Sequence, residues 1–175
     1  GDKKVLDYLK EMGADIRHTR GDIIVKGKGL KGIEIDMNST PDALPAMAVA
    51  GCFAEGETRL VNVPQARVKE TDRISVMCSE LKKMGADIEE LPEGLVVRNS
   101  KLKGCPVSGY DDHRIVMALA VAGMNIEGET VIDTAEAMNV TFPEFPLLVK
   151  ECGGDIETII EESEGWRGYS AWEYI

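Results

Sequence analysis

An internal repeat constrains the fold of this chain more than any single motif, because each copy must adopt the same local structure. TPDALPAMAVAGCFAEGETRLVNV at 40–63 is matched by YDDHRIVMALAVAGMNIEGETVIDT at 110–134, with equivalent glycines 72 residues apart. A second element occurs three times, as LDYLKEMGADI at 6–16, CSELKKMGADI at 78–88 and PLLVKECGGDI at 146–156. Each copy of it predicts an amphipathic helix that ends at a glycine and leads into an extended run.

Together these elements form one repeating unit. In the central copy we expect a strand at 32–37, a helix at 41–54, a strand at 57–63, a helix at 72–84, and strands at 86–90 and 95–98. The predicted fold class is therefore α/β (α+β), with repeated βαβαββ units. The helices that begin near Pro41 and Asp112 are apolar nearly all round, which predicts buried helices at the centre and sheets outside.

The repeat also predicts the domain organisation. We expect a single domain at 1–156, made of a partial first unit at 1–30, a second unit at 31–100 and a third unit at 101–156, followed by an acidic, aromatic tail at 157–175. The first unit contains only a helix at 3–12 and strands at 14–18 and 22–26, so we expect the chain to begin partway through a larger protein. Its missing elements should leave an apolar surface, which the tail or a second copy of the chain can cover.

Composition excludes several kinds of partner. The 20 Lys and Arg against 31 Asp and Glu give a net charge of −11, which argues against nucleic acid and anionic membranes. No apolar run approaches the roughly 18 residues of a membrane span. Cys52, Cys78, Cys105 and Cys152 are too scattered for a zinc ligand pair or a redox CxxC motif. We therefore expect a cytoplasmic protein with reduced thiols and no bound metal.

Polar residues distinguish the two copies at the points where chemistry could occur. Asp42 lies at the first helix start, DHR at 112–114 lies at the second, and the charged loop RVKETDR at 67–73 has an almost uncharged counterpart at 138–145. An Asp at a helix start is often only a cap, and a loop of mixed charge can be only a solvated helix entrance. Arg114 is harder to explain in this way, because a cation near the positive end of a helix is unfavourable unless an anion is also bound.

These segments resemble a known enzyme family. DMNSTPDA, RVKETDRI and YDDHRIVMALA, in this order and spacing, are similar to the EPSP synthase family, the 3-phosphoshikimate 1-carboxyvinyltransferases. The resemblance runs from GDKKVLDYLKEMGADI to TFPEF, but it covers only about the C-terminal two fifths of a full-length member. It implies an enolpyruvyl transferase-like (EPT/RTPC-like) fold and an enzyme of the shikimate pathway that leads to chorismate and the aromatic amino acids. Members transfer the enolpyruvyl group of phosphoenolpyruvate to the 5-hydroxyl of shikimate 3-phosphate without a cofactor, and release phosphate.

The resemblance also implies roles for residues at the matching positions. Asp42 would contact the shikimate hydroxyls and take a proton, Lys69 would lie near the reacting hydroxyl, and Glu70 would protonate the methylene carbon. Arg73 and Arg114 would hold phosphoenolpyruvate through their guanidinium groups. The implied catalytic residues are Asp42, Lys69 and Glu70, and the implied substrate-binding residues are Asp42, Gln65, Lys69, Arg73, His113 and Arg114.

Two positions depart from the family pattern. Gln65 stands where many members have Asn, and Val140 stands where many have a Lys that helps to hold phosphoenolpyruvate and the inhibitor glyphosate. The family's N-terminal domain, which supplies the opposite wall of the cleft, is also missing. We therefore expect this chain to fold but to be nearly inactive alone, because catalysis requires both walls to close on the substrates.

Two alternative functions stay open from the sequence. The cell-wall enolpyruvyl transferase that acts on UDP-N-acetylglucosamine has the same architecture and the same donor, although KETDR and DHR argue against it. The other alternative is a non-catalytic repeat domain whose charged loops bind a partner. Binding of shikimate 3-phosphate or phosphoenolpyruvate near Asp42, Glu70 and Arg114 would distinguish an active site from such a domain.

Overall fold

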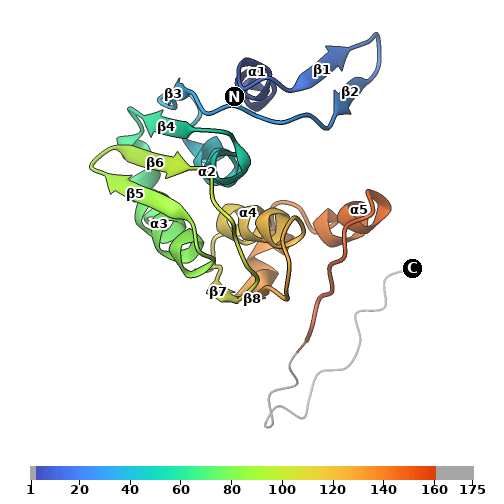
Figure 1. Cartoon of the computed structure of the whole chain (residues 1–175). Helices are drawn as coiled ribbons and strands as arrows, with labels where there is room; N and C mark the ends of the chain where they lie inside the picture. Colours follow the sequence, from blue (N-terminus) through green and yellow to red (C-terminus); the bar gives the residue numbers. More distant parts are fainter. Residues whose placement is uncertain (1–2, 161–175) are drawn as a thin grey trace, which may run out of the picture.

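The computed structural model describes residues 3–160, and its elements follow the repeat (Figure 1). The first unit contains α1 (Lys4–Glu11), β1 (Asp15–His18) and β2 (Ile23–Lys26). The second contains β3 (Glu34–Asp36), α2 (Leu44–Phe53), β4 (Glu57–Val61), α3 (Arg73–Lys83), β5 (Asp87–Leu91) and β6 (Gly94–Arg98). The third contains β7 (Pro106–Ser108), α4 (His113–Gly123), β8 (Val131–Asp133) and α5 (Phe145–Glu151). Short 3₁₀ helices η1 (Pro41–Ala43), η2 (Pro64–Val68) and η3 (Ala135–Val140) connect these elements.

The repeat extends to the pairing of the strands. In the four-stranded sheet, of order β3-β4-β6-β5, strand β3 runs parallel to β4 with Ile35 opposite Leu60. Strand β7 runs parallel to β8 with Val107 opposite Ile132, which are the same two positions 72 residues later. The remaining pairs, β1–β2, β4–β6 and β5–β6, are antiparallel. The two copies therefore share one register as well as one sequence pattern.

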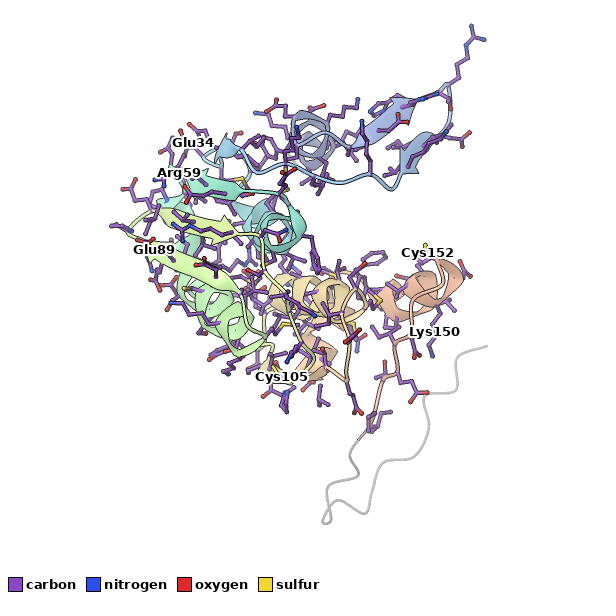
Figure 2. All side chains as sticks on the ribbon, viewed as in Figure 1. Glu34, Arg59, Glu89, Cys105, Lys150 and Cys152 are labelled. Carbon is purple, nitrogen blue, oxygen red and sulfur yellow. The ribbon has the colours of Figure 1, made fainter. Side chains whose placement is uncertain are left out.

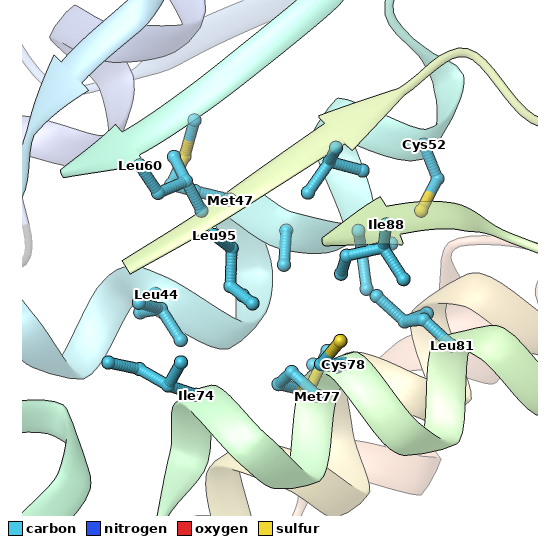
Figure 3. Close-up of a cluster of buried hydrophobic side chains, with 14 of the residues drawn as sticks. Leu44, Met47, Cys52, Leu60, Ile74, Met77, Cys78, Leu81, Ile88 and Leu95 are labelled. Atoms are coloured by element: carbon cyan, nitrogen blue, oxygen red, sulfur yellow. The ribbon is translucent and has the colours of Figure 1, made fainter. Parts of the chain in front are cut away.

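The core lies between the helices and the inner face of the four-stranded sheet, as the apolar helices predict. Figure 3 shows side chains of α2 and α3 meeting those of the strands, among them Leu44, Met47, Ile74, Leu81, Leu60 and Leu95, all fully buried. The outer face of the sheet carries charges instead. Arg59 on β4 pairs with Glu34 on β3 (Figure 2). Arg98 on β6 pairs with residues of β4 and β5. This alternation is typical of a sheet with one buried and one solvated face.

Element boundaries differ from the sequence prediction where backbone geometry intervenes. Strand β4 ends at Val61 and not at 63, because Asn62 has a left-handed backbone (φ 58°) that cannot continue a strand. Helix α3 begins at Arg73 because the carboxylate of Asp72 caps it, accepting the Ser75 N–H at 3.0 Å.

The third unit departs most from the prediction. The extended run expected to open at Asp155 forms no strand, since residues 154–160 have no regular structure and are largely exposed. A single strand needs a paired neighbour to satisfy its backbone groups, and none follows within the described residues. The aromatic residues assigned to the tail, from Trp166 onward, lie outside the described residues.

The first unit exposes apolar side chains on β2. Ile23, Ile24 and Val25 are all exposed, and the β1–β2 hairpin extends away from the four-stranded sheet in Figure 1. An apolar surface near α1 was expected from the incomplete first unit. Among residues 3–160, no helix combines the length and the apolar character needed to cross a membrane.

Candidate active site

Six of the seven predicted site residues lie together at the N-terminal ends of α2, α3 and α4. Asp42 lies in η1, which leads into α2, and Arg73 is the first residue of α3. Lys69 and Glu70 lie in the loop between η2 and α3, whereas His113 and Arg114 begin α4. Because the buried helices start near one another, residues more than seventy positions apart in the chain become neighbours.

Asp42 is the centre of this cluster. Its carboxylate lies 3.2 Å from Lys69 Nζ, 2.7 Å from Arg73 Nη1 and 3.9 Å from Arg114 Nη2. The Arg114 guanidinium also donates a hydrogen bond to the Asp42 carbonyl at 3.3 Å. Burial alone would raise the pKa of Asp42, but the Lys69 hydrogen bond and the charges of the three cations outweigh it and hold the pKa below 3.8. Asp42 is therefore ionised at neutral pH and can accept a proton.

Arg73 is buried beneath three carboxylates. Its side chain is only 1% exposed, with Nε and Nη2 donating to Asp112 at 2.7 and 3.1 Å, Nη1 donating to Asp42 at 2.7 Å and Nη2 donating to Glu70 at 2.6 Å. Burial opposes its charge, but Asp112, Glu70 and Asp42 outweigh burial and raise the pKa of Arg73 above its usual value. The guanidinium thus holds acids in place, and a ligand would reach it only by displacing them.

Asp112 is the member of the cluster to which no site role was assigned from the sequence. Its side chain is 0% exposed, pairs with Arg73 and also caps α4 by accepting the Arg114 N–H at 2.9 Å. The sequence showed an Asp at a helix start, which is the ordinary signal of a cap. Nothing in the local sequence points to a partner 39 residues away.

Glu70 forms the exposed edge of the cluster, with the largely buried His113 beside it. One oxygen of Glu70 accepts from Arg73, and the other lies 4.0 Å from His113 Nδ1. The Glu70 side chain is 47% exposed, and those of Lys69 and Arg114 are each 30% exposed. An incoming ligand can therefore reach a carboxyl and two cations at this surface, whereas the His113 side chain is only 12% exposed.

Gln65 and Arg67 lie apart from the cluster. The Gln65 amide donates to Asn38 Oδ1, and among the described residues no hydrogen bond or ion pair joins Gln65 to Asp42 or its partners. Arg67 instead ties η2 to the sheet, donating to the Leu91 and Pro92 carbonyls at 2.7 Å and pairing with Asp72 and Glu90 at 2.8 Å. Within the charged loop at 67–73, Arg67 therefore has a structural role, whereas Lys69, Glu70 and Arg73 belong to the cluster.

A small groove adjoins the cluster between α2 and α4. Asp42 and Arg114 line its polar end, and side chains such as Val49, Met117 and Val121 line the rest. Its volume is about 170 Å³, below the roughly 300–1,000 Å³ of typical ligand pockets. Within residues 3–160 the cluster therefore lies on a wall and not inside an enclosed pocket. Val140, at the end of η3, is exposed.

Sequence comparisons point to one family. The family model described as EPSP synthase (3-phosphoshikimate 1-carboxyvinyltransferase) matches residues 1–147. A protein of that enzyme name from Ruminiclostridium cellulolyticum is 74% identical over 159 residues, which cover 91% of this chain and 38% of the relative. Another, from Methanocaldococcus jannaschii, is 48% identical over 159 residues, covering 90% of this chain and 37% of that protein. The chain thus spans under two fifths of the length of these curated relatives.

Solved structures agree with these matches. An EPSP synthase from Acinetobacter baumannii has a TM-score of 0.73 and 34% identity, covering 84% of this chain and 38% of that chain. The enolpyruvyl transferase NikO from Streptomyces tendae has a TM-score of 0.69 at 19% identity, covering 87% of this chain and 35% of that chain. At that identity the second match bears on the fold alone, and it agrees with the predicted enolpyruvyl transferase-like fold.

Proposed function

Because the chain belongs to the EPSP synthase family, we propose that it is the C-terminal part of a 3-phosphoshikimate 1-carboxyvinyltransferase and carries one wall of its active site. The proposed reaction transfers the enolpyruvyl group of phosphoenolpyruvate to the 5-hydroxyl of shikimate 3-phosphate. The opposite wall would come from the N-terminal domain, the proposed partner of this chain. The four cysteines form no disulfide, which fits the reducing conditions of the cytoplasm.

Asp42 is suited to activate the acceptor hydroxyl. In the addition step the hydroxyl oxygen bonds to C2 of phosphoenolpyruvate, its proton leaves, and C3 gains a proton. The ionised Asp42 carboxylate can take the departing hydroxyl proton, although the cations that lower its pKa also make it a weaker base. Lys69, 3.2 Å from Asp42, can hold both the carboxylate and the hydroxyl oxygen in position.

Glu70 is suited to exchange a proton with C3. In the addition step Glu70 would donate this proton, and in the elimination step it would take one back as the C2–O bond to phosphate breaks and the double bond re-forms. The Glu70 oxygen that faces His113 is the one available for this transfer, because the other is engaged by Arg73. His113 can then orient Glu70 through its ring nitrogen.

Anion binding falls to Arg114 and Lys69, whose side chains are partly exposed. Phosphoenolpyruvate carries a carboxylate and a phosphate, and guanidinium groups bind both in bidentate fashion. Arg73 has its donors engaged by three acids, so its role here is to position Asp42 and Glu70. Binding of phosphoenolpyruvate by Arg73, which the family resemblance implies, stays a prediction.

One observation carries the proposal: three cations and three carboxylates, Asp42 among them, converge on an open wall from three separate segments of the chain. The test is a chimera that joins this chain to the N-terminal part of the 74% identical Ruminiclostridium cellulolyticum relative, with phosphate release as the readout. We expect phosphate release that depends on both shikimate 3-phosphate and phosphoenolpyruvate.

Variants of the chimera make the test specific. Glu70→Gln should lower kcat at least about 100-fold, the usual contribution of a general acid–base group, whereas Glu89→Gln on the outer sheet face should leave it unchanged. A chimera that is folded but inactive with these substrates would refute the proposal. Activity with UDP-N-acetylglucosamine as acceptor would instead favour the cell-wall reaction.

A further inference from the structure

Two buried polar residues outside the Asp42 cluster occupy the same place in the repeat. Tyr8 on α1 and Glu80 on α3 lie 72 residues apart, and each helix is followed by the sequence Met-Gly-Ala-Asp-Ile. Both are buried, and Glu80 is wholly inaccessible. Neither residue touches the acids and bases to which the reaction is assigned.

Glu80 binds the turn that leads into α4. One oxygen accepts the Ser108 N–H at 2.9 Å and the Lys83 ammonium at 2.7 Å, and the other accepts the Tyr110 hydroxyl at 3.3 Å and the Ser79 hydroxyl at 3.1 Å. Four donors thus converge on two carboxylate oxygens. Two of them belong to the turn between β7 and α4, in the next unit of the chain.

That turn has an unfavourable backbone. Tyr110 and Asp111 both have φ of 53°, a left-handed conformation that is costly for residues other than glycine. Such a turn persists only where its surroundings hold it. Within the third unit, Asp133 accepts the Gly109 N–H and Thr134 accepts the Asp111 N–H, each at 3.0 Å. Glu80 holds the same turn from the second unit.

Helix α3 contacts both ends of this turn. Arg73 and Glu80 are seven residues apart, which places them two turns apart on one face of the helix. Arg73 binds Asp112 at the end of the turn, and Glu80 binds Ser108 at its beginning. The residues between these two contacts direct the chain into His113, the first residue of α4.

Tyr8 makes the equivalent contact one unit earlier. Its hydroxyl lies 2.9 Å from Thr40 Oγ1 and donates to the Asp36 carbonyl at 3.4 Å. Residues 36–40 correspond to 108–112 in the repeat, and they lead into Pro41 and Asp42. A phenol and a carboxylate, different in chemistry, therefore bind turns at equivalent positions in the two copies, although only the second turn contains left-handed residues.

We propose that Glu80 and Tyr8 are positioning residues: each clamps the turn that delivers site residues to the start of the next buried helix. Glu80 fixes His113 and Arg114, and Tyr8 fixes Asp42. Their importance to catalysis rests on the proposed function. The ordering of the two turns does not, because it requires no ligand.

Hydrogen exchange of backbone amides in the 175-residue chain, followed by NMR, tests this ordering. Glu80→Met keeps the length of the side chain but removes every acceptor, so the amides of Ser108, Asp112 and Arg114 should exchange at least about tenfold faster. Tyr8→Phe should accelerate the Thr40 amide and leave residues 108–114 unchanged. Glu80→Gln should restore slow exchange, because an amide oxygen can still accept from Ser108 and the hydroxyls can reverse their bonds.

Two exchange patterns would contradict the proposal. Uniform acceleration that includes the amides of β6 would mean general destabilisation, and unchanged exchange at 108–114 would mean no clamp; either result overturns the proposal. If Glu80→Met does not fold, Tyr110→Phe removes one of the two bonds to the turn, and faster exchange confined to the turn is again expected. A parallel titration with phosphoenolpyruvate keeps the two proposals separate. Absence of binding would count against the proposed function and leave the exchange pattern as evidence for the clamp.

Discussion

Removing one partner of the buried ion pair between Arg73 and Asp112 should destabilise this domain strongly, because it leaves the other charge buried. Both side chains are almost completely buried, and Asp112 accepts three hydrogen bonds, two from Arg73 and one from the Arg114 amide. We therefore choose Asp112→Ala as the perturbation, since it leaves the Arg73 charge in the interior.

The structure gives the expected size of the effect. Breaking a buried ion pair by removing one partner costs about 3–5 kcal/mol, and loss of a helix cap costs about 1 kcal/mol. Arg73 still retains Asp42 and Glu70, which lie 2.7 and 2.6 Å away. The retained acids favour the lower end of that range, about 3 kcal/mol. Asp112→Asn should cost less than Asp112→Ala, because the amide keeps the cap and one acceptor.

Urea unfolding at pH 7, followed by circular dichroism, measures this loss directly. Asp87→Ala is the matched control, because it removes a surface ion pair. In that pair the Arg98 side chain is 38% exposed and the Asp87 side chain is 64% exposed. Such a pair contributes at most about 1 kcal/mol. If Asp112→Ala lost no more stability than Asp87→Ala, the buried bridge would not be what holds the starts of α3 and α4 together.

Four further predictions follow from buried and exposed groups elsewhere. Thr58 has a fully buried hydroxyl with no hydrogen-bond partner among the described residues, so Thr58→Val should raise the free energy of unfolding in urea by about 1 kcal/mol; a lower value would contradict this. A Cβ on Gly123 would lie 2.9 Å from Thr130 Cβ, so Gly123→Ala should lower the melting temperature, and an unchanged value would mean that α4 can shift away from β8. Burial would raise the pKa of Glu80, but its bonds from Lys83, Ser108 and Ser79 lower it overall. Its contribution to stability is therefore present above the unfolded pKa near 4.5 and is lost as pH falls through the lower folded pKa. The difference in unfolding free energy between wild type and Glu80→Met should therefore shrink as the pH is lowered below 4.5. Exposed β2 should promote self-association, which Val25→Lys should reduce in sedimentation velocity; a wild-type chain that is monomeric at high concentration would argue against this.

Local pattern was sufficient to predict much of the fold. The 72-residue offset between copies predicted equivalent strands and helices, and the structure confirms it down to the register of Ile35 with Leu60 and Val107 with Ile132. The all-apolar character of α2 and α4 likewise predicted buried helices beneath an outer sheet. These features can be predicted from the sequence because helix and strand periodicity, helix-terminating glycines and helix caps depend on residues only a few positions apart.

The sequence also indicated which residue types gather at the site, but it could not say how they pair. Arg67 and Arg73 belong to the same charged loop, yet one ties η2 to the sheet and the other lies buried beneath three acids. Gln65, which the resemblance implies as a substrate-binding residue, donates a hydrogen bond to Asn38 in this structure. Such choices depend on side-chain reach and burial after the helices have packed.

Tertiary structure alone decided the contacts between units. Arg73 pairs with Asp112, and Tyr8 and Glu80 contact turns at equivalent positions. Each of these contacts joins residues about 28 to 39 positions apart. No periodicity relates residues at such separations, because they meet only when one unit packs against the next. Burial then selects the pairs, since a charge removed from water is tolerated only beside its partner.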